Sequence, residues 1–187
     1  MKSCLIVIDV QESFRHRPYF DAAALPRYLQ AQNALIAAAL ADRIPVVRVL
    51  HADEPDTPDN PFSHASGLVR PLEGLMAFDA ALTVHKARHS ALVGTGLDVW
   101  LVQQGIGRVV ISGIRTEQCC ETTARHASDL GWEVDFVTEA THTFDMPDTE
   151  GRLLTAEQIR HRTAAVLDGR FAQVCSVAEA TARWQAA

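Results

Sequence analysis

Runs of apolar residues, each long enough for one strand, alternate along the chain with segments of helical periodicity. Most of these runs are continuous and rich in Val and Ile, which is typical of strands covered on both faces in a parallel sheet. The predicted strands are Cys4–Asp9, Pro45–His51, Leu82–Lys86, Arg108–Ser112, Glu133–Thr138 and Ala172–Val177. The predicted helices are Ala22–Ala41, Leu97–Gln104, Glu117–Leu130 and Ala156–Leu167. The alternation predicts one three-layer α/β/α domain over residues 1–187, with right-handed crossovers.

Two segments lack either pattern and are expected to be loops, namely Asp53–Pro71 with its prolines and His142–Gly151. In open α/β sheets, ligands bind beyond the carboxyl ends of the strands. Several polar or turn-forming residues fall at such ends: Asp9, His51, Lys86 and Gly113. We therefore expect the functional site at this edge of the sheet.

Cys119 is the strongest candidate for chemistry. It follows a predicted buried strand and a tight turn, and we expect it in the first turn of the next helix. The free N–H groups and the dipole at a helix N-terminus lower the pKa of a thiol and favour a thiolate. The same N–H groups could hold an oxyanion during acyl transfer. Cys119 is thus a candidate nucleophile.

The neighbouring Cys120 falls on the apolar stripe of the same helix and is expected to face the core, whereas Glu121 is expected to point away from it. A free cysteine commonly serves as a small hydrophobic residue, so a purely structural role for both thiols stays open. Thiol redox chemistry of the pair is a further alternative, which the core-facing position of Cys120 disfavours.

Asp9 and Lys86 each end a predicted strand. A carboxylate at the position of Asp9 could accept the proton of a thiol, or could merely cap a turn. Lys86 could be a solvated charge, but close to a carboxylate and a thiol it would favour the anionic form of both.

Composition narrows the class of protein. The chain has 48% hydrophobic and 21% charged residues and a formal charge of −6, which is ordinary for a globular domain and argues against nucleic-acid or anionic-membrane partners. No apolar run is long enough for a transmembrane helix or a signal peptide, and we expect a cytoplasmic protein. The four cysteines show neither disulfide nor zinc spacing.

Three segments together resemble the signature blocks of the isochorismatase-like cysteine hydrolases. They are Leu5–Gln11 with Phe14, Lys86 with Ser90-Ala91, and Gly113–Cys119 with Thr123–Arg125. The resemblance implies a Rossmann-like six-stranded parallel sheet and a triad of Asp9, Lys86 and Cys119. It also implies a cis peptide between Ile114 and Arg115, with the N–H groups of Arg115 and Cys119 forming an oxyanion hole.

This resemblance implies hydrolysis of a small amide, carbamoyl or ureido compound. Cys119 would attack the carbonyl, and Asp9 would take the thiol proton and pass it to the leaving amine. Lys86 would stabilise the charged forms, and water would hydrolyse the thioester. The alternatives are a nicotinamidase-type amidase and a non-catalytic binding or assembly module on the same fold.

The match departs from the nicotinamidases, which bind a metal through an Asp-x-His pair, because Val49 stands two residues before His51. We therefore expect no metal and no cofactor, and a polar pocket or loop role for His51 and His64. The partner is a small-molecule substrate, and the resemblance implies a homodimer or homotetramer. Residues that could shape the substrate pocket are Phe14, Arg15, His51, His89 and Arg115.

Overall fold

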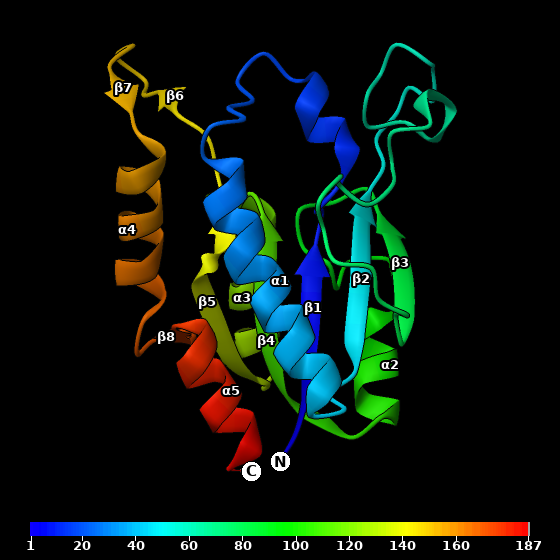
Figure 1. The fold of residues 1–187 in the computed structure, drawn as a ribbon, viewed down its shortest axis with the longest axis vertical. Helices are drawn as coiled ribbons and strands as arrows, with labels where there is room; N and C mark the ends of the chain where they lie inside the picture. Colours follow the sequence, from blue (N-terminus) through cyan, green and yellow to red (C-terminus); the bar gives the residue numbers. More distant parts are fainter. Residues whose placement is uncertain (187) are drawn as a thin grey trace.

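Six parallel strands form the central sheet of the computed structural model, which describes residues 1–186 (Figure 1). Their order is β3-β2-β1-β4-β5-β8. The strands are β1 (Lys2–Ile8), β2 (Val46–His51), β3 (Leu82–Lys86), β4 (Ile106–Ile114), β5 (Glu133–His142) and β8 (Gln173–Cys175). A separate antiparallel pair joins β6 (Met146–Pro147) to β7 (Leu153–Leu154). The predicted parallel α/β fold is confirmed.

Helices cover both faces of this sheet. They are α1 (Leu25–Ala41), α2 (Leu97–Gln103), α3 (Glu121–Asp129), α4 (Ala156–Leu167) and α5 (Val177–Gln185). Three short turns of other helical types are η1 (Glu12–His16), η2 (His64–Ser66) and η3 (Thr116–Cys120), of which η3 is a π-helical turn. In Figure 1, α1 and α5 lie in front of the sheet, with α2 and α3 behind it.

The alternation of side chains along β1 explains these layers. Ile6 and Ile8 pack into one apolar cluster with residues of α2 and α3, whereas Leu5 and Val7 pack into the other with residues of α1 and α5. Because successive side chains of a strand point to opposite faces, a continuous apolar run must be covered twice. The sheet is therefore buried on both sides.

Several predicted boundaries were wrong. The strands β4 and β5 continue to Ile114 and His142, so part of the expected turn and loop is regular sheet. The helix predicted from Glu117 is a π-helical turn followed by α3, and Cys119 lies in that turn. The helix α5 was not predicted, although Ser176 and Glu179 at its start form a capping box that is visible in the sequence.

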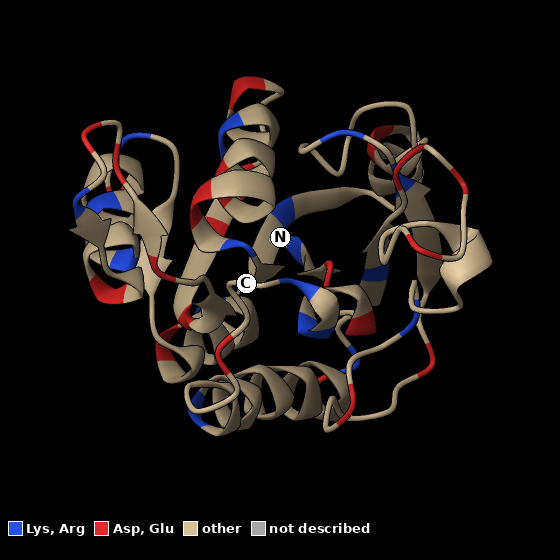
Figure 2. Ribbon diagram, turned by 90° about the horizontal axis from the view of Figure 1, so that it is seen from above, with Lys and Arg blue, Asp and Glu red and all other residues tan. Residues whose placement is uncertain are grey.

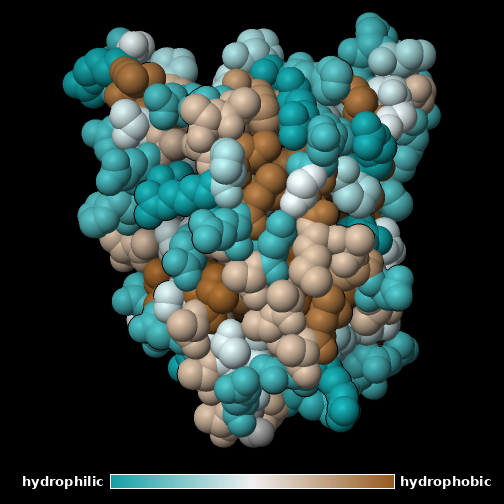
Figure 3. All heavy atoms as spheres, in the orientation of Figure 1, coloured by the Kyte–Doolittle hydropathy of each residue, from teal (hydrophilic) through white to brown (hydrophobic). Residues whose placement is uncertain are grey.

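Acidic and basic residues intermingle around the loops and helices seen from above (Figure 2). On the face that carries α1, hydrophobic residues gather along the middle, and hydrophilic residues lie mostly toward the margins (Figure 3). Within residues 1–186, no helix has both the length and the apolar character needed to cross a membrane.

Candidate active site

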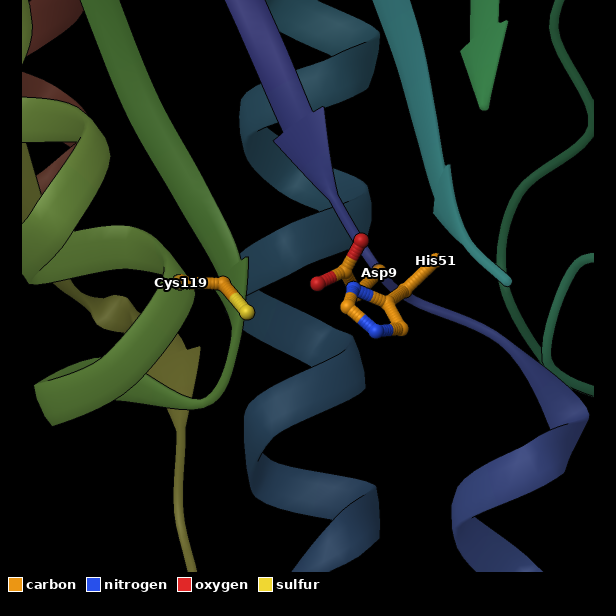
Figure 4. A group of neighbouring side chains, drawn as sticks. All are labelled: Asp9, His51 and Cys119. Atoms are coloured by element: carbon orange, nitrogen blue, oxygen red, sulfur yellow. The ribbon is translucent and has the colours of Figure 1, made fainter. Parts of the chain in front are cut away.

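The carboxyl ends of four neighbouring strands bring the predicted residues together. Asp9 directly follows β1, while His51 and Lys86 end β2 and β3 and pair with each other in the sheet register. Cys119 comes from the turn after β4, the strand on the other side of β1. Figure 4 shows Asp9 and His51 on one side of the site and the sulfur of Cys119 pointing toward them.

A left-handed backbone conformation at Asp9, with φ of 52°, turns the chain out of β1 and leaves the carboxyl group in the site. Aspartate is among the few residues with side chains that visit this region readily. The side chain of Gln11 then ties the ends of β1 and β2 together. It donates to the carbonyl of His51 at 3.0 Å and accepts from the N–H of His51 at 2.7 Å. This tether was not foreseen.

Lys86 is the centre of the site. Its ammonium nitrogen lies 2.7 Å from Oδ2 of Asp9, 2.8 Å from Nδ1 of His51 and 3.3 Å from Sγ of Cys119. An ammonium group has three hydrogens to donate, so each neighbour can receive one. Burial lowers the pKa of Lys86, but the nearby Asp9 and Cys119 outweigh it and raise the pKa above its usual value. The lysine stays charged.

His51 connects Lys86 to a residue nearer the surface. Because the ammonium of Lys86 can only donate, Nδ1 of His51 is the acceptor. The imidazole then carries its hydrogen on Nε2, which lies 2.7 Å from Oδ1 of Asp53. A hydrogen-bonded chain therefore runs from the half-exposed Asp53 through His51 to Lys86.

The expected thiolate at Cys119 is wrong for the resting protein. Burial, followed by the charge of Asp9, raises the pKa of the thiol to about 12, although Lys86 acts in the opposite direction. The thiol is 7% exposed and lies in η3, so the first turn of α3 begins after it. The sequence pattern could not reveal either the burial or the π-helical turn. The sulfur could therefore act as a nucleophile only after a base has removed its proton.

The turn between β4 and Cys119 has an unusual backbone. Gly113 has φ of 130°, and a Cβ atom there would lie 2.0 Å from the carbonyl oxygen of Ile8. The peptide bond between Ile114 and Arg115 is cis. The Arg115 guanidinium then lies 3.0 Å from Oε1 of Glu117 and over the ring of Tyr19.

The other predicted pocket residues divide into two groups. His89 is exposed and its Nδ1 lies 3.8 Å from Sγ of Cys119. Phe14 instead packs edge-on against Phe62 in the apolar cluster, and Arg15 pairs with Glu12. Neither Phe14 nor Arg15 has a hydrogen bond or ion pair to the site among the contacts of residues 1–186.

Carboxylate, imidazole and thiol groups so close together could also hold a metal ion. The ligand atoms of Asp9, His51 and Cys119 all lie within 4.8 Å of one another. The ammonium of Lys86, however, already contacts one atom of each, and a second cation at that position would face a buried positive charge. This set of donors does not fit a divalent metal while Lys86 is charged.

A solved structure has a closely similar arrangement of elements. The isochorismatase-family protein of Chromobacterium violaceum, known from a crystal structure, shares 27% sequence identity with this chain. The structural match covers 100% of this chain and 95% of that protein, with a TM-score of 0.86.

Two curated relatives carry specific names. The streptothricin hydrolase of Streptomyces noursei is 30% identical over 146 residues, which span 76% of this chain and 50% of that protein. Nicotinamidase 3 of Arabidopsis thaliana is 41% identical over 71 residues, 38% of this chain and 36% of that protein. The model of the isochorismatase domain family matches residues 3–175, nearly the whole sequence. The chain therefore belongs to the isochorismatase family of hydrolases.

Proposed function

We propose that this protein hydrolyses a small amide, carbamoyl or ureido compound through a thioester on Cys119. The observation that carries the proposal is the position of Lys86, whose ammonium contacts both a buried carboxylate and the thiol sulfur. Such a cation stabilises an anion that forms at either neighbour. The nicotinamidase among the relatives is an amide hydrolase by name, which supports the bond type.

The first chemical step follows from the protonated thiol. Asp9 lies within 4.8 Å of the sulfur and acts as the base that takes the thiol proton while the sulfur attacks the carbonyl carbon. Lys86 holds the carboxylate in place and stabilises the developing thiolate. Since the pKa of the thiol is about 12, attack and proton removal are coupled.

Charge then develops on the carbonyl oxygen of the substrate. The N–H groups of Arg115 and Cys119 serve as the oxyanion hole, and one such donor is typically worth about 2.7–4 kcal/mol. Arg115 and Glu117 place a donor and an acceptor side by side next to this turn. That pairing suits a carbamoyl or ureido group, which presents a carbonyl oxygen and N–H groups together.

The test is a panel of small amides, N-carbamoyl compounds, ureido compounds and nicotinamide, with release of amine or ammonia as the measurement. Turnover should disappear in Cys119→Ala, and intact-protein mass spectrometry of the wild-type protein should reveal an acyl adduct on Cys119. Hydrolysis that persists in Cys119→Ala would sink the mechanism. Binding of a panel compound without turnover or adduct would favour a binding module instead.

A further inference from the structure

His89 is the exposed neighbour of the candidate nucleophile. It lies in the loop between β3 and α2, and its Nδ1 is 3.8 Å from Sγ of Cys119. The other neighbours of the sulfur are Lys86, Asp9 and His51, which are 3%, 0% and 9% exposed, and Nδ1 of His51 already accepts from Lys86. The sulfur therefore has a buried acid–base partner and, independently, an imidazole that water can reach.

The loop that carries His89 is fastened to the same segment as the nucleophile. Oγ of Ser90 lies 2.8 Å from Nδ1 of His126, and the N–H of Ala91 donates to Oγ1 of Thr123 at 3.0 Å. His126 and Thr123 both belong to α3, which begins two residues after Cys119. These two contacts hold the position of His89 relative to the sulfur.

We propose that His89 is a second acid–base group of the reaction, serving the leaving amine and the attacking water, while Asp9 serves only the thiol. This role rests on the function proposed above. Asp9 is fully buried and its Oδ2 is held by Lys86, so it is poorly placed to exchange protons with incoming water. The exposed imidazole of His89 lies within reach of the sulfur and can exchange protons with incoming water.

The proton balance closes with two groups. Asp9 takes the thiol proton as the carbon–sulfur bond forms, and the imidazolium of His89 protonates the nitrogen as the carbon–nitrogen bond breaks. Neutral His89 then accepts a proton from the water that attacks the thioester. When the carbon–sulfur bond breaks, the departing thiolate recovers its proton from Asp9, and both groups return to their starting state.

The activated ester p-nitrophenyl acetate separates the two half-reactions, because its leaving group needs no proton. In His89→Gln the initial burst of p-nitrophenolate should match that of the wild-type protein to within about twofold. Hydrolysis of the acetyl group on Cys119 should slow by about 10²–10⁴-fold, the usual range for general acid–base catalysis. Mass spectrometry should accordingly show the acetylated protein accumulating.

Chemical rescue provides a readout that a structural role would not move. Exogenous imidazole should restore deacylation in His89→Ala, since the site of the missing ring is exposed. His161→Gln is the matched control, because His161 is an exposed histidine on α4. It should leave both phases unchanged.

The outcomes separate the two proposals. An acetyl adduct on Cys119 that His89→Gln hydrolyses at the wild-type rate would overturn the role of His89 alone. Failure of the wild-type protein to become acetylated on Cys119 would overturn the proposed function and this role with it.

Discussion

Two clusters of charged side chains, each around a buried carboxylate, differ in how completely the oxygens of that carboxylate are paired. The site cluster contains Asp9, His51, Lys86 and Cys119. The second cluster, called the bridging cluster because it joins α3 to α4, contains Glu121, Arg125, Arg162 and Thr163. Oε1 of Glu121 accepts a hydrogen bond from Arg125 at 3.0 Å. Its Oε2 accepts from Arg162 at 2.6 Å and from Thr163 at 3.0 Å.

In the bridging cluster both carboxylate oxygens of Glu121 have donors, whereas Oδ1 of Asp9 is buried without any hydrogen-bond partner among the described residues. A buried polar atom without a partner destabilises a fold, so such atoms are uncommon unless they serve a purpose. The free lone pairs on Asp9 are where a thiol proton could go. The difference teaches what each carboxylate is free to do: that of Glu121 is fully occupied in joining two helices, whereas Asp9 keeps an oxygen free beside the thiol, as the proposed base requires.

The largest expected effect comes from removing the central cation. Lys86→Met should lower kcat by on the order of 10³-fold, because both the base and the developing thiolate lose their buried counter-charge. Turnover of a substrate from the amide panel is the measurement. Lys2→Met is the matched control, since Lys2 is the other lysine of the sequence and is exposed. Near-normal turnover by Lys86→Met would show that the site cluster needs no cation.

Glu121→Gln tests the other half of the comparison. The free energy of unfolding should fall by about 2 kcal/mol, less than for a fully buried pair because Arg162 and Arg125 are 59% and 32% exposed. Urea denaturation measures this change. For the folded protein, kcat should change by less than about tenfold, below the loss expected for a proton-transfer group. A larger loss of kcat would mean that Glu121 takes part in the chemistry.

Asp9→Asn should separate the reactivity of the thiol from turnover. The charge of Asp9 raises the pKa of Cys119, so its removal lowers that pKa and increases the thiolate fraction at every pH below it. The thiolate fraction near pH 8 should rise about tenfold for each unit that the pKa falls. Alkylation by iodoacetamide should become faster by less than this factor, because a thiolate of lower pKa is a weaker nucleophile, while hydrolysis is lost.

The wild-type alkylation rate provides the reference for this prediction. It should keep rising with pH toward about 12, because the thiol is protonated below that value. A plateau near neutral pH, or slower alkylation of Asp9→Asn, would contradict the pKa order derived from the site.

The smallest effect is expected at the exposed end of the hydrogen-bonded chain. Asp53 is 46% exposed at its side chain, and Asp53→Asn keeps an oxygen that can accept from Nε2 of His51. We expect kcat to fall by no more than about fivefold, as for a solvent-exposed pair. Steady-state kinetics with Glu54→Gln as the neighbouring control measure it. A loss as large as that of Lys86→Met would place Asp53 inside the site cluster.

The sheet and the meeting of Asp9 and Lys86 at its edge could be expected from the sequence, because continuous apolar runs and the residues that end them are local features. The place of Cys119 beside them was implied by the resemblance to the family. Other features depend on contacts between distant segments. The predicted exposure of Glu121 was wrong, since Arg162 and Thr163 of α4 cover it. The raised pKa of Cys119 likewise reflects burial beside a carboxylate from another strand.

The absent side chain of Gly113 has a consequence for how this chain can change over time. A methyl group there would collide with the carbonyl of Ile8, and the residue after Ile8 is Asp9. Any replacement must therefore push apart the two strand ends that carry the candidate base and the candidate nucleophile. Mutations in the surrounding loops can change what reaches the site, but the spacing of these two strand ends depends on glycine at position 113.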